Sequence, residues 1–352
     1  MSNKRLLMAM SGGVDSSVAA HLMLSKGYSV LGATMKLVNG LPGISDDSDG
    51  DLKAAQSTCR LLGIEHHTVD MCEEFKRHVV ENFAEVYRQG KTPNPCIICN
   101  KFIKFGALLD YALANNCDGI ASGHYAKIEH DASGRFLLKK ATDDSKDQSY
   151  MLWMLSQDQL SKIYLPLGEM TKKEARDIAA SLGFDNAHKK DSQDICFIPD
   201  GDYVSFIKHY TSLSFPEGNY VDINGNTLGK HKGMINYTVG QRKGLGIALG
   251  QPMFVRSKDA ESNTVVLCRD EELYSKRLTA TGINLIACDS LYEPTRLLAK
   301  ARYRHTASPA TVVQIDKHRI SVEFDEPIRA IAPGQSLVLY DGDTVVGGGF
   351  IE

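Results

Sequence analysis

The sequence predicts an α/β fold in which a doubly wound parallel sheet is followed by two small β domains, the last of them a β-barrel. Up to about residue 200, short apolar runs alternate with helical segments, as in the βα units of a parallel sheet. Beyond about residue 213, helical periodicity fades, and short alternating runs separated by Gly and Asn turns replace it. The 352 residues exceed one ordinary domain, so we expect domains at 1–212, 213–278 and 279–352.

The first unit contains a strand, a Gly-rich turn and a helix. Residues 6–10 form an apolar run typical of a buried parallel strand, and residues 18–24 predict a helix that ends at Gly27. The turn at residues 11–17 reads Ser-Gly-Gly-Val-Asp-Ser-Ser. Its glycines let backbone approach a ligand closely, and the free N–H groups and positive end of the helix attract an anion such as phosphate. The Gly-Lys-Ser/Thr of the kinase-type phosphate loop is absent.

The later elements continue the alternation. Ligands of such a sheet bind at the carboxyl ends of its strands, and both the turn at 11–13 and the pair Gly123-His124 follow strand ends. In the C-terminal half, a join between the two β domains is expected near 275–282. The remaining predictions are strands at 28–34, 65–69, 119–122, 264–267 and 311–313, helices at 54–62, 73–88 and 105–113, and a turn at 224–226.

Composition limits the function classes. Hydrophobic residues at 43% and charged residues at 24% are typical of soluble globular proteins. No run approaches the length of a membrane span, and no signal-peptide core opens the chain, so we expect a cytoplasmic protein without a membrane partner. The 8 cysteines are then thiols, metal ligands or catalytic groups rather than a disulfide scaffold. A net charge of -3 excludes a protein that is basic all over but leaves room for local basic patches.

Three cysteines are candidates for chemistry. Cys96 and Cys99 are separated by two residues in a segment with two prolines, which predicts a rigid loop with both thiols facing one centre. Three interpretations stay open for this pair: a structural zinc site, thioredoxin-like thiol exchange, and sulfur handling. A structural zinc site usually needs a second cysteine pair, which this sequence does not contain, whereas the phosphate turn in the same chain favours sulfur handling. Cys196 follows Lys189 and Lys190, two cations that favour a thiolate. The remaining cysteines are expected to be buried and inert: Cys59, Cys72, Cys117, Cys268 and Cys288.

Two stretches of the β region carry basic residues and no acidic ones. A charge run is usually a solvated face, but two acid-free runs in β modules favour surfaces that follow nucleic-acid phosphates. The first, residues 223–258, and the second, residues 296–305, contain Lys230, Lys232, Arg242, Lys243, Arg256, Lys258, Arg296, Lys300, Arg302 and Arg304.

Several motifs occur in a recognisable order. They are residues 9–17, 94–100, 123–125, 146–150, 192–197 and 237–245. The first resembles the pyrophosphate loop of ATP pyrophosphatases, and together the motifs resemble the tRNA-specific 2-thiouridylases, called MnmA, over essentially the whole chain. The resemblance implies a sheet of the adenine-nucleotide α-hydrolase (PP-loop) type. It also implies ATP-dependent thiolation of the wobble uridine (position 34) of tRNA, in which the 2-oxygen is adenylated and a persulfide sulfur replaces it, releasing AMP and pyrophosphate.

The same resemblance implies roles for particular residues. Cys196 would carry the persulfide, and Cys99 would be the nucleophile that frees its sulfur through a transient Cys99–Cys196 disulfide. ATP, with Mg²⁺, would be held by Ala9, Met10, Ser11, Gly12, Gly13, Val14, Asp15, Ser16, Met35 and Gly123. The tRNA contacts would be Asn94, Pro95, Cys96, His124, Lys146, Asp147, Gln148, Arg302, Tyr303 and Gln335. A persulfide donor (a cysteine desulfurase or a relay protein) would be a partner, and the protein would be a monomer.

Cys96 departs from the pattern of the best-known members, which carry Asp at this position as a proposed acid/base. A cysteine thiol has an ordinary pKa of about 8.5 and an aspartate carboxyl one of about 4, so the two side chains are not equivalent. Either Cys96 takes that role as a shifted thiolate, or Cys96, Cys99 and Cys196 hold three corners of a [4Fe-4S] cluster that activates sulfide. Two further alternatives are another PP-loop adenylating synthetase and a non-catalytic tRNA- or metal-binding protein. Iron analysis and tRNA-dependent pyrophosphate release separate these possibilities.

Overall fold

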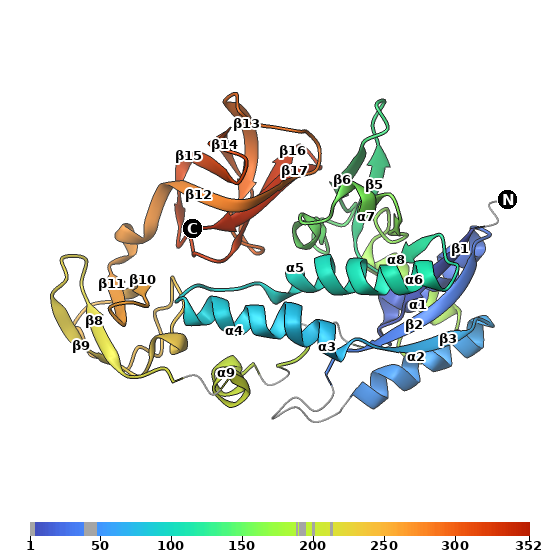
Figure 1. Cartoon of the computed structure of the whole chain (residues 1–352), viewed down its shortest axis with the longest axis horizontal. Helices are drawn as coiled ribbons and strands as arrows, with labels where there is room; N and C mark the ends of the chain where they lie inside the picture. Colours follow the sequence, from blue (N-terminus) through green and yellow to red (C-terminus); the bar gives the residue numbers. More distant parts are fainter. Residues whose placement is uncertain (1–3, 39–47, 188, 190–194, 199–200, 212–213) are drawn as a thin grey trace. The chain divides into compact units, whose positions relative to one another are not determined.

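The computed structural model describes residues 4–38, 48–187, 189, 195–198, 201–211 and 214–352 (Figure 1). The chain divides into two compact units. The first contains Met1–Val80, Cys96–Gly201 and Asp343–Val345, and the second contains Glu81–Pro95, Asp202–Gly342 and Val346–Glu352. No helix in the described ranges is long and apolar enough to cross a membrane.

A parallel sheet forms the centre of the first unit, in the order β3-β2-β1-β4-β7. Because β1 pairs with β2 on one side and β4 on the other, the strand order reverses at β1, which confirms the doubly wound prediction. Leu6, Leu7 and Met8 of β1 are fully buried, as expected for a central parallel strand. The strands are β1 (Arg5–Ala9), β2 (Ser29–Lys36), β3 (His66–Asp70), β4 (Gly119–Ala121) and β7 (Ile163–Tyr164).

Helices cover this sheet. Val18, Ala19 and Ala20 of α1 belong to the same buried cluster as strand residues Leu6 and Met8. The larger helices of the unit are α1 (Val14–Ser25), α2 (Ser48–Leu62), α6 (Leu108–Ala114) and α8 (Lys172–Ser181). The helix predicted at 73–88 is divided into α3 (Cys72–Phe75), a π-helical stretch η1 (Lys76–Val80) and α4 (Glu81–Arg88).

The rigid loop predicted around Cys96 and Cys99 is wrong. Pro95–Cys99 forms the helix α5, which continues through the π-helical stretch η2 (Asn100–Ala107) into α6. Pro95 is the first helical residue, where the missing N–H is not needed and the fixed φ suits a helix. Pro95 therefore starts a helix, and Cys96 and Cys99 lie in its first turns.

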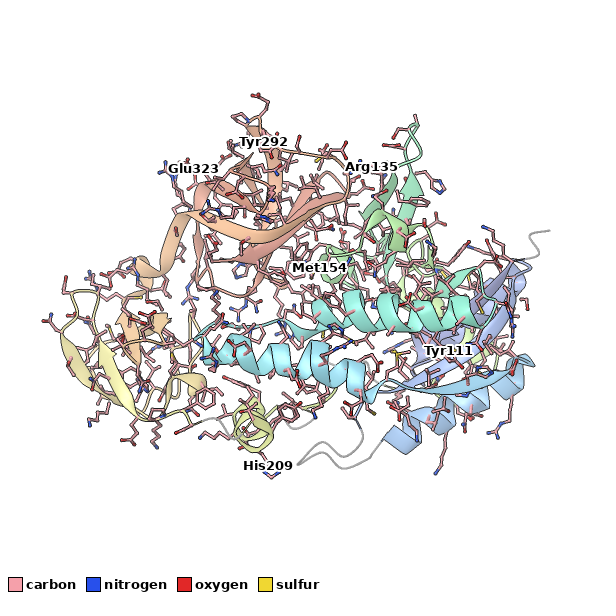
Figure 2. The ribbon with its side chains drawn as sticks, in the orientation of Figure 1. Tyr111, Arg135, Met154, His209, Tyr292 and Glu323 are labelled. Atoms are coloured by element: carbon pink, nitrogen blue, oxygen red, sulfur yellow. The ribbon has the colours of Figure 1, made fainter. Side chains whose placement is uncertain are left out.

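A hairpin and short helices complete the first unit. Strands β5 (Ala126–His130) and β6 (Phe136–Lys140) pair antiparallel, with Arg135 beside the turn (Figure 2). Thr344 and Val345, which belong to this unit, pair with β6. The short helical elements are η3 (Ser149–Leu152) and α7 (Gln157–Leu160).

The second unit contains a small sheet in the order β10-β11-β8-β9. Gly225, with φ of 85°, lies in the predicted turn between β8 and β9. Tyr220, Val255 and Leu267 are among the residues of its buried core. The elements are β8 (Gly218–Val221), β9 (Thr227–His231), β10 (Phe254–Asp259), β11 (Thr264–Cys268), α9 (Tyr203–Thr211), η4 (Met234–Asn236) and η5 (Asp270–Leu273).

The predicted C-terminal β-barrel is confirmed. Strands of the described chain pair in the order β12-β15-β14-β13-β16-β17, and pairing of β17 with β12 closes the barrel. Val322, Phe324 and Leu339 are among the residues that fill it. The strands are β12 (Tyr274–Leu285), β13 (Thr295–Lys300), β14 (Ser308–Gln314), β15 (Arg319–Arg329), β16 (Ser336–Asp341) and β17 (Thr344–Ile351). Because β12 runs through 275–282, where a join was expected, the exact domain boundaries stay a prediction.

Candidate functional site

The Gly-rich turn at residues 11–13 connects β1 to α1 and leaves a helix N-terminus open. Gly12 has φ of 73°, and a Cβ there would lie 2.2 Å from the carbonyl oxygen of Asp51, so only glycine fits. Gly13 is the N-cap of α1 and provides no side chain to cap the first N–H groups. Ser16 Oγ accepts from the Ser11 backbone N–H at 3.2 Å and donates to the Gly13 carbonyl at 3.0 Å, which fixes the turn. This geometry suits a phosphate chain.

Asn186 hydrogen-bonds to the turn and to the first residues of α1, and this role was not predicted from the sequence. Its Nδ2 donates to the Gly12 carbonyl and to Ser17 Oγ, both at 3.0 Å. The side chain is only 6% exposed, and its Oδ1 has no hydrogen-bond partner among the described residues. A single Asn between two helices carries no signal in the sequence that would have identified this role.

The other residues predicted to hold ATP lie around the same strand ends. A Cβ on Gly123 would lie 2.9 Å from the Ser16 backbone nitrogen, so β4 ends directly against the first turn of α1. Ala9 ends β1, Met10 donates its N–H to the Ala33 carbonyl at 2.8 Å, and Met35 lies on β2. These residues therefore lie at the carboxyl ends of neighbouring strands, where the strand order reverses, and their contact with ATP stays a prediction.

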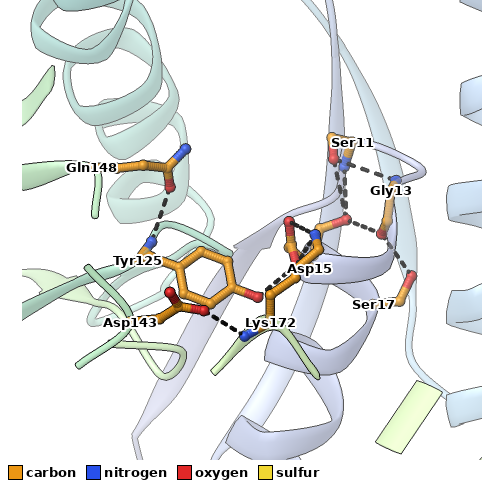
Figure 3. A network of polar contacts seen from close by, with 9 residues as sticks. Ser11, Gly13, Asp15, Ser17, Tyr125, Asp143, Gln148 and Lys172 are labelled. Atoms are coloured by element: carbon orange, nitrogen blue, oxygen red, sulfur yellow. Dashed lines mark hydrogen bonds and ion pairs between the residues drawn. The ribbon is translucent and has the colours of Figure 1, made fainter. Parts of the chain in front are cut away.

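Asp15 is held by two side chains that sequence reasoning missed (Figure 3). Lys172 Nζ donates to both carboxylate oxygens of Asp15 at 2.8 Å, and the Tyr125 hydroxyl donates to Oδ1 at 2.9 Å. Lys172 is the first residue of α8, and its backbone N–H donates to Asp143 at 3.0 Å. Lys172 and Asp15 are 157 residues apart, and a lysine at a helix start gives no motif that could have been recognised.

The described side chains fit Mg²⁺ only in part. Mg²⁺ bound with a nucleotide usually takes one or two carboxylates and several phosphate oxygens. Asp15 supplies one carboxylate beside the turn, but in this structure the cation against it is Lys172. Among the described residues, no group of three or more His, Cys, Asp or Glu side chains is arranged to hold a metal ion. Asp15 is therefore the candidate Mg²⁺ ligand, provided that Lys172 moves to another acceptor.

The three candidate cysteines lie in the first unit as free thiols. Cys99 is buried, whereas Cys96 and Cys196 are exposed. Phe197, next to Cys196, packs its ring edge against Phe75 at 5.4 Å and anchors that segment. The charges of Cys196 and Cys96 act on Cys99, so the three thiols are close enough to influence one another. The structure thus brings together two sites that are about a hundred residues apart in sequence.

Burial holds these thiols in the neutral form. It raises the pKa of Cys99 to about 12 and that of Cys196 to about 11, and it also raises the pKa of Cys96. Because the Cys196 side chain still reaches solvent, hydration of its thiolate reduces this increase. A thiolate is the reactive nucleophile, so the site needs a positive charge to counter burial.

Lys104 supplies that charge and was also missed from the sequence. It lowers the pKa of all three thiols against the effect of burial. Lys104 lies in η2, five residues after Cys99, and the wider turn of a π-helix places such residues one above the other. Lys189, expected to favour the Cys196 thiolate, pairs instead with Asp51, and Lys190 and Ser192 lie outside the described residues.

A three-thiolate iron–sulfur site is not formed by these cysteines in the structure. The described residues contain no group of three or more potential ligands in a metal-binding arrangement. Cys96 and Cys99 both lie in the short helix α5. The thiols present therefore do not fit a cluster as they stand.

Four residues predicted to contact tRNA belong to the first unit, as the phosphate turn and the three thiols do. His124 bonds Ser122 Oγ through Nδ1 at 2.8 Å and contacts the Phe105 ring. Burial, followed by the charge of Lys104, lowers the pKa of His124 well below its ordinary value, so the imidazole is neutral. Asp147 Oδ1 accepts from the Ser149 N–H at 3.1 Å. Lys146 and Gln148 are partly exposed on either side of it.

Other predicted tRNA contacts belong to the second unit. Gln335 is 7% exposed, and its Nε2 donates to the carbonyls of Thr92 and Pro93 at 3.0 and 3.3 Å. In this structure it therefore braces the segment that leads to Asn94 and Pro95. Arg302 and Tyr303 lie just after β13, where Lys300 Nζ is 5.4 Å from the Tyr303 ring centroid. Their contact with tRNA stays a prediction.

Two residues of the basic runs have structural roles instead. Lys258 Nζ donates to the Tyr237 carbonyl at 2.9 Å and lies over the Tyr87 ring, and burial lowers its pKa to about 8. Arg296 binds Asp325 with both terminal nitrogens, at 2.8 and 2.5 Å. Neither was recognisable from charge spacing alone. The exposed basic side chains of the first run are Lys230, Lys232, Arg242, Lys243 and Arg256.

Comparisons with known proteins identify the family. Residues 4–200 match the family model described as tRNA methyl transferase HUP domain, residues 204–269 its PRC-barrel domain, and residues 275–351 an aminomethyltransferase beta-barrel domain. The tRNA-specific 2-thiouridylase MnmA of Treponema denticola is 46% identical over 99% of this chain and 98% of that protein. The MnmA of Acetivibrio thermocellus is 47% identical over 100% of both chains. The chain belongs to the MnmA family.

Membership of the MnmA family confirms the resemblance inferred from the motifs. The MnmA of Clostridioides difficile gives the same result, with 47% identity over 99% of this chain and 98% of that protein. The solved U34-tRNA thiolase NcsA from Methanococcus maripaludis, with its [4Fe-4S] cluster, is 22% identical, with a TM-score of 0.36 over 59% of this chain and 66% of that chain. That likeness is too low to carry an argument about ligands of this MnmA family member.

Proposed function

We propose that this protein catalyses ATP-dependent 2-thiolation of the wobble uridine, position 34, of tRNA. The observation that carries the proposal is the dipeptide Gly123-His124, which links two reactive sites. Gly123 packs against the first turn of α1 beside Asp15, while His124 and Cys99 both interact with Lys104. This short segment therefore contacts the phosphate turn through Gly123, and its His124 is affected by the same lysine charge as the thiols. Identity of 46–47% to proteins named tRNA-specific 2-thiouridylase supports the substrate.

The first step is adenylation of the uridine. The 2-oxygen attacks the α-phosphorus of ATP, a new O–P bond forms, and the α–β phosphate bond breaks to release pyrophosphate. The open N–H groups at the start of α1 bind the phosphate chain and stabilise its growing negative charge. Mg²⁺, when bound through Asp15, would screen the pyrophosphate charge. Because His124 is neutral, it adds no charge to the site. The positive potential there comes from the start of α1 and from Lys172.

The second step transfers sulfur. A persulfide on Cys196 attacks C2 of the uridine through its terminal sulfur, and the C2–O bond breaks, so that AMP leaves with the original oxygen. The Cys99 thiolate then attacks Sγ of Cys196, which forms a Cys99–Cys196 disulfide and leaves the terminal sulfur on C2. A dithiol reductant reopens the disulfide. Lys104 favours the Cys99 thiolate against burial, which is the protein's contribution to this step.

The sulfur donor and the assembly complete the proposal. The donor is a protein persulfide, either a cysteine desulfurase or a relay protein, which must reach the exposed Cys196. The enzyme acts as a monomer in the cytoplasm. The alternative route, a [4Fe-4S] cluster on the three thiols, rests on ligand type alone, and no step is derived through it. Another PP-loop synthetase would have no use for the thiol centre.

The test uses purified full-length protein with unmodified tRNA, ATP and a small-molecule persulfide donor. We expect pyrophosphate release that depends on tRNA, and 2-thiouridine at position 34 detected by nuclease digestion and mass spectrometry. Omitting the persulfide should preserve one pyrophosphate per tRNA while abolishing 2-thiouridine. Pyrophosphate release that does not respond to tRNA would contradict the proposed substrate.

A further inference from the structure

Tyr125 connects the phosphate turn to a segment predicted to contact tRNA. Its hydroxyl donates to Asp15 Oδ1 at 2.9 Å. Its backbone N–H donates to Gln148 Oε1 at 2.9 Å, and its carbonyl accepts from the Gln148 backbone N–H at 2.8 Å. Figure 3 shows this chain of contacts from Gln148 through Tyr125 to Asp15. All three residues belong to the first unit.

The Tyr125 part of this link is rigid. The side chain is 2% exposed, and Lys172 Nζ lies 5.9 Å from its ring centroid. A buried ring held by its own backbone at one end and by a carboxylate at the other has no room to reorient. Lys172 can exchange one anion for another on its flexible stem, but Tyr125 cannot. Because the ring is rigid, a shift or restraint of the Tyr125 backbone is passed on to Asp15.

The Gln148 end of the link is open. Its Oε1 is used by Tyr125, whereas its Nε2 makes no hydrogen bond within the described residues. Figure 3 shows the amide nitrogen directed away from Tyr125. Gln148 is partly exposed, and it follows Lys146 and Asp147 in the same segment. An amide with its oxygen fixed and its nitrogen free is suited to bind an acceptor on a nucleobase or a ribose.

We propose that Gln148 and Tyr125 form a link that couples tRNA binding to ATP binding at the phosphate turn. This inference rests on the proposed function. An acceptor bound at Nε2 orders Gln148, which holds the Tyr125 backbone and thereby fixes Asp15. ATP then binds to a turn whose carboxylate is already ordered, so each ligand tightens the binding of the other. A link of a few hydrogen bonds supports coupling at the low end of the usual range, about fivefold.

The test measures binding and not turnover. The affinity of full-length protein for α,β-methylene-ATP is determined by calorimetry with and without saturating tRNA. We expect tRNA to tighten binding of the analogue about fivefold in the wild type and less than about twofold in Tyr125→Phe. By reciprocity, the analogue should tighten tRNA binding by the same factor. The matched control is Tyr111→Phe in α6 of the same unit, which also removes one phenolic hydrogen bond, to His67 at 2.8 Å (Figure 2). It should keep the wild-type coupling.

A double variant makes the test independent of any single substitution. Gln148→Ala should weaken tRNA binding and also lose coupling. Because the two residues act as one link, combining Tyr125→Phe with Gln148→Ala should lose no more coupling than either change alone. Full coupling in Tyr125→Phe, no coupling in the wild type, or equal loss in Tyr111→Phe would each overturn the inference. These results differ from failure of the proposed function, which would appear as no tRNA-dependent pyrophosphate release in the wild type.

Discussion

Lys172 places its ammonium nitrogen 2.8 Å from both carboxylate oxygens of Asp15, with the Tyr125 hydroxyl on the same carboxylate. The Lys172 side chain is 10% exposed and that of Asp15 is 32% exposed, so this ion pair is largely shielded from water. A shielded pair has two consequences. It fixes the carboxylate beside the phosphate turn, and it makes each partner depend on the other for its charge balance.

The first prediction concerns this pair. Asp15→Asn keeps the shape of the side chain but removes its charge, so tRNA-dependent pyrophosphate release should fall by at least about a hundredfold. It also removes the Asp15 carboxylate from the Lys172 ammonium group, and we expect a loss of about 1–3 kcal/mol in the free energy of unfolding, below the value for full burial because Asp15 is partly exposed. The control is Asp177→Asn on α8, whose pair with Lys173 is exposed. Chemical denaturation should show a clearly smaller loss in the free energy of unfolding for this variant than for Asp15→Asn.

The second prediction concerns the pH dependence of the thiols. The pKa of Cys99 is raised to about 12 and that of Cys196 to about 11, so the thiolate fraction of both should grow through the whole range from neutral pH upward. Alkylation by iodoacetamide, followed by peptide mass spectrometry, should accelerate about tenfold per pH unit below those values. Lys104→Met removes the charge that lowers both pKa values and should slow alkylation at every pH. Lys101→Met, which loses a contact to Gln159 instead, should not. Equal rates in Lys104→Met and the wild type would contradict this role of Lys104.

The third prediction separates sulfur transfer from activation. Cys99→Ser and Cys196→Ser should each abolish formation of 2-thiouridine, because one removes the nucleophile and the other the persulfide carrier. Neither residue lies in the phosphate turn, so ATP binding and tRNA binding should stay within about twofold of the wild type. Cys288→Ser, in the second unit, is the control and should keep full activity. Mass spectrometry of each variant after incubation with a persulfide donor should show the added sulfur only where Cys196 is present.

Sequence patterns were sufficient for the sheet, the barrel and the phosphate turn. Apolar runs such as residues 6–10 are local signals, and a turn rich in glycine is recognisable because few residues can adopt its backbone. The patterns failed where the same residues suit two structures. Pro95 was expected to maintain a loop, yet at the first position of a helix it is favourable. Local chemistry alone could not decide between them.

Partners that meet only in the folded chain could not be predicted. Lys172 reaches Asp15 across 157 positions, and Asn186 reaches Gly12 across 174. A lysine and an asparagine are common on any surface, so nothing near them in sequence indicates a role. The same limit explains Lys258, which was counted as a phosphate contact but donates to the Tyr237 carbonyl. Charge spacing shows where cations are, and the fold decides what they bind.

The fourth prediction concerns Cys96. If it acts as an acid/base, Cys96→Asp restores the residue of the best-known relatives and should retain substantial thiolation in protein free of iron. Burial, the main cause of the raised pKa of Cys96, should also raise the pKa of the new carboxyl, but a carboxyl still ionises at lower pH than a thiol in the same place, so the activity profile should shift to lower pH than that of the wild type. Iron and labile sulfide are measured in anaerobically purified protein. Loss of both iron and activity in Cys96→Asp would support the cluster route instead.

The fifth prediction concerns the basic run of the second unit. Arg242 and Lys243 are exposed, and no acidic residue occurs from 223 to 258, so phosphate contacts there should make tRNA binding steeply dependent on salt. Changing both residues to alanine should weaken binding and flatten the slope of log K against log salt by about one unit per lost contact. Arg302→Ala should weaken binding and flatten the slope by about one unit, as expected for one lost contact.

Arg296→Ala is the matched control, because Arg296 is already paired with Asp325 and is not available to a phosphate. Filter binding from about 50 to 200 mM salt measures all four proteins. If the Arg242/Lys243 variant keeps the wild-type slope, the run is ordinary solvated surface, and tRNA must be bound elsewhere.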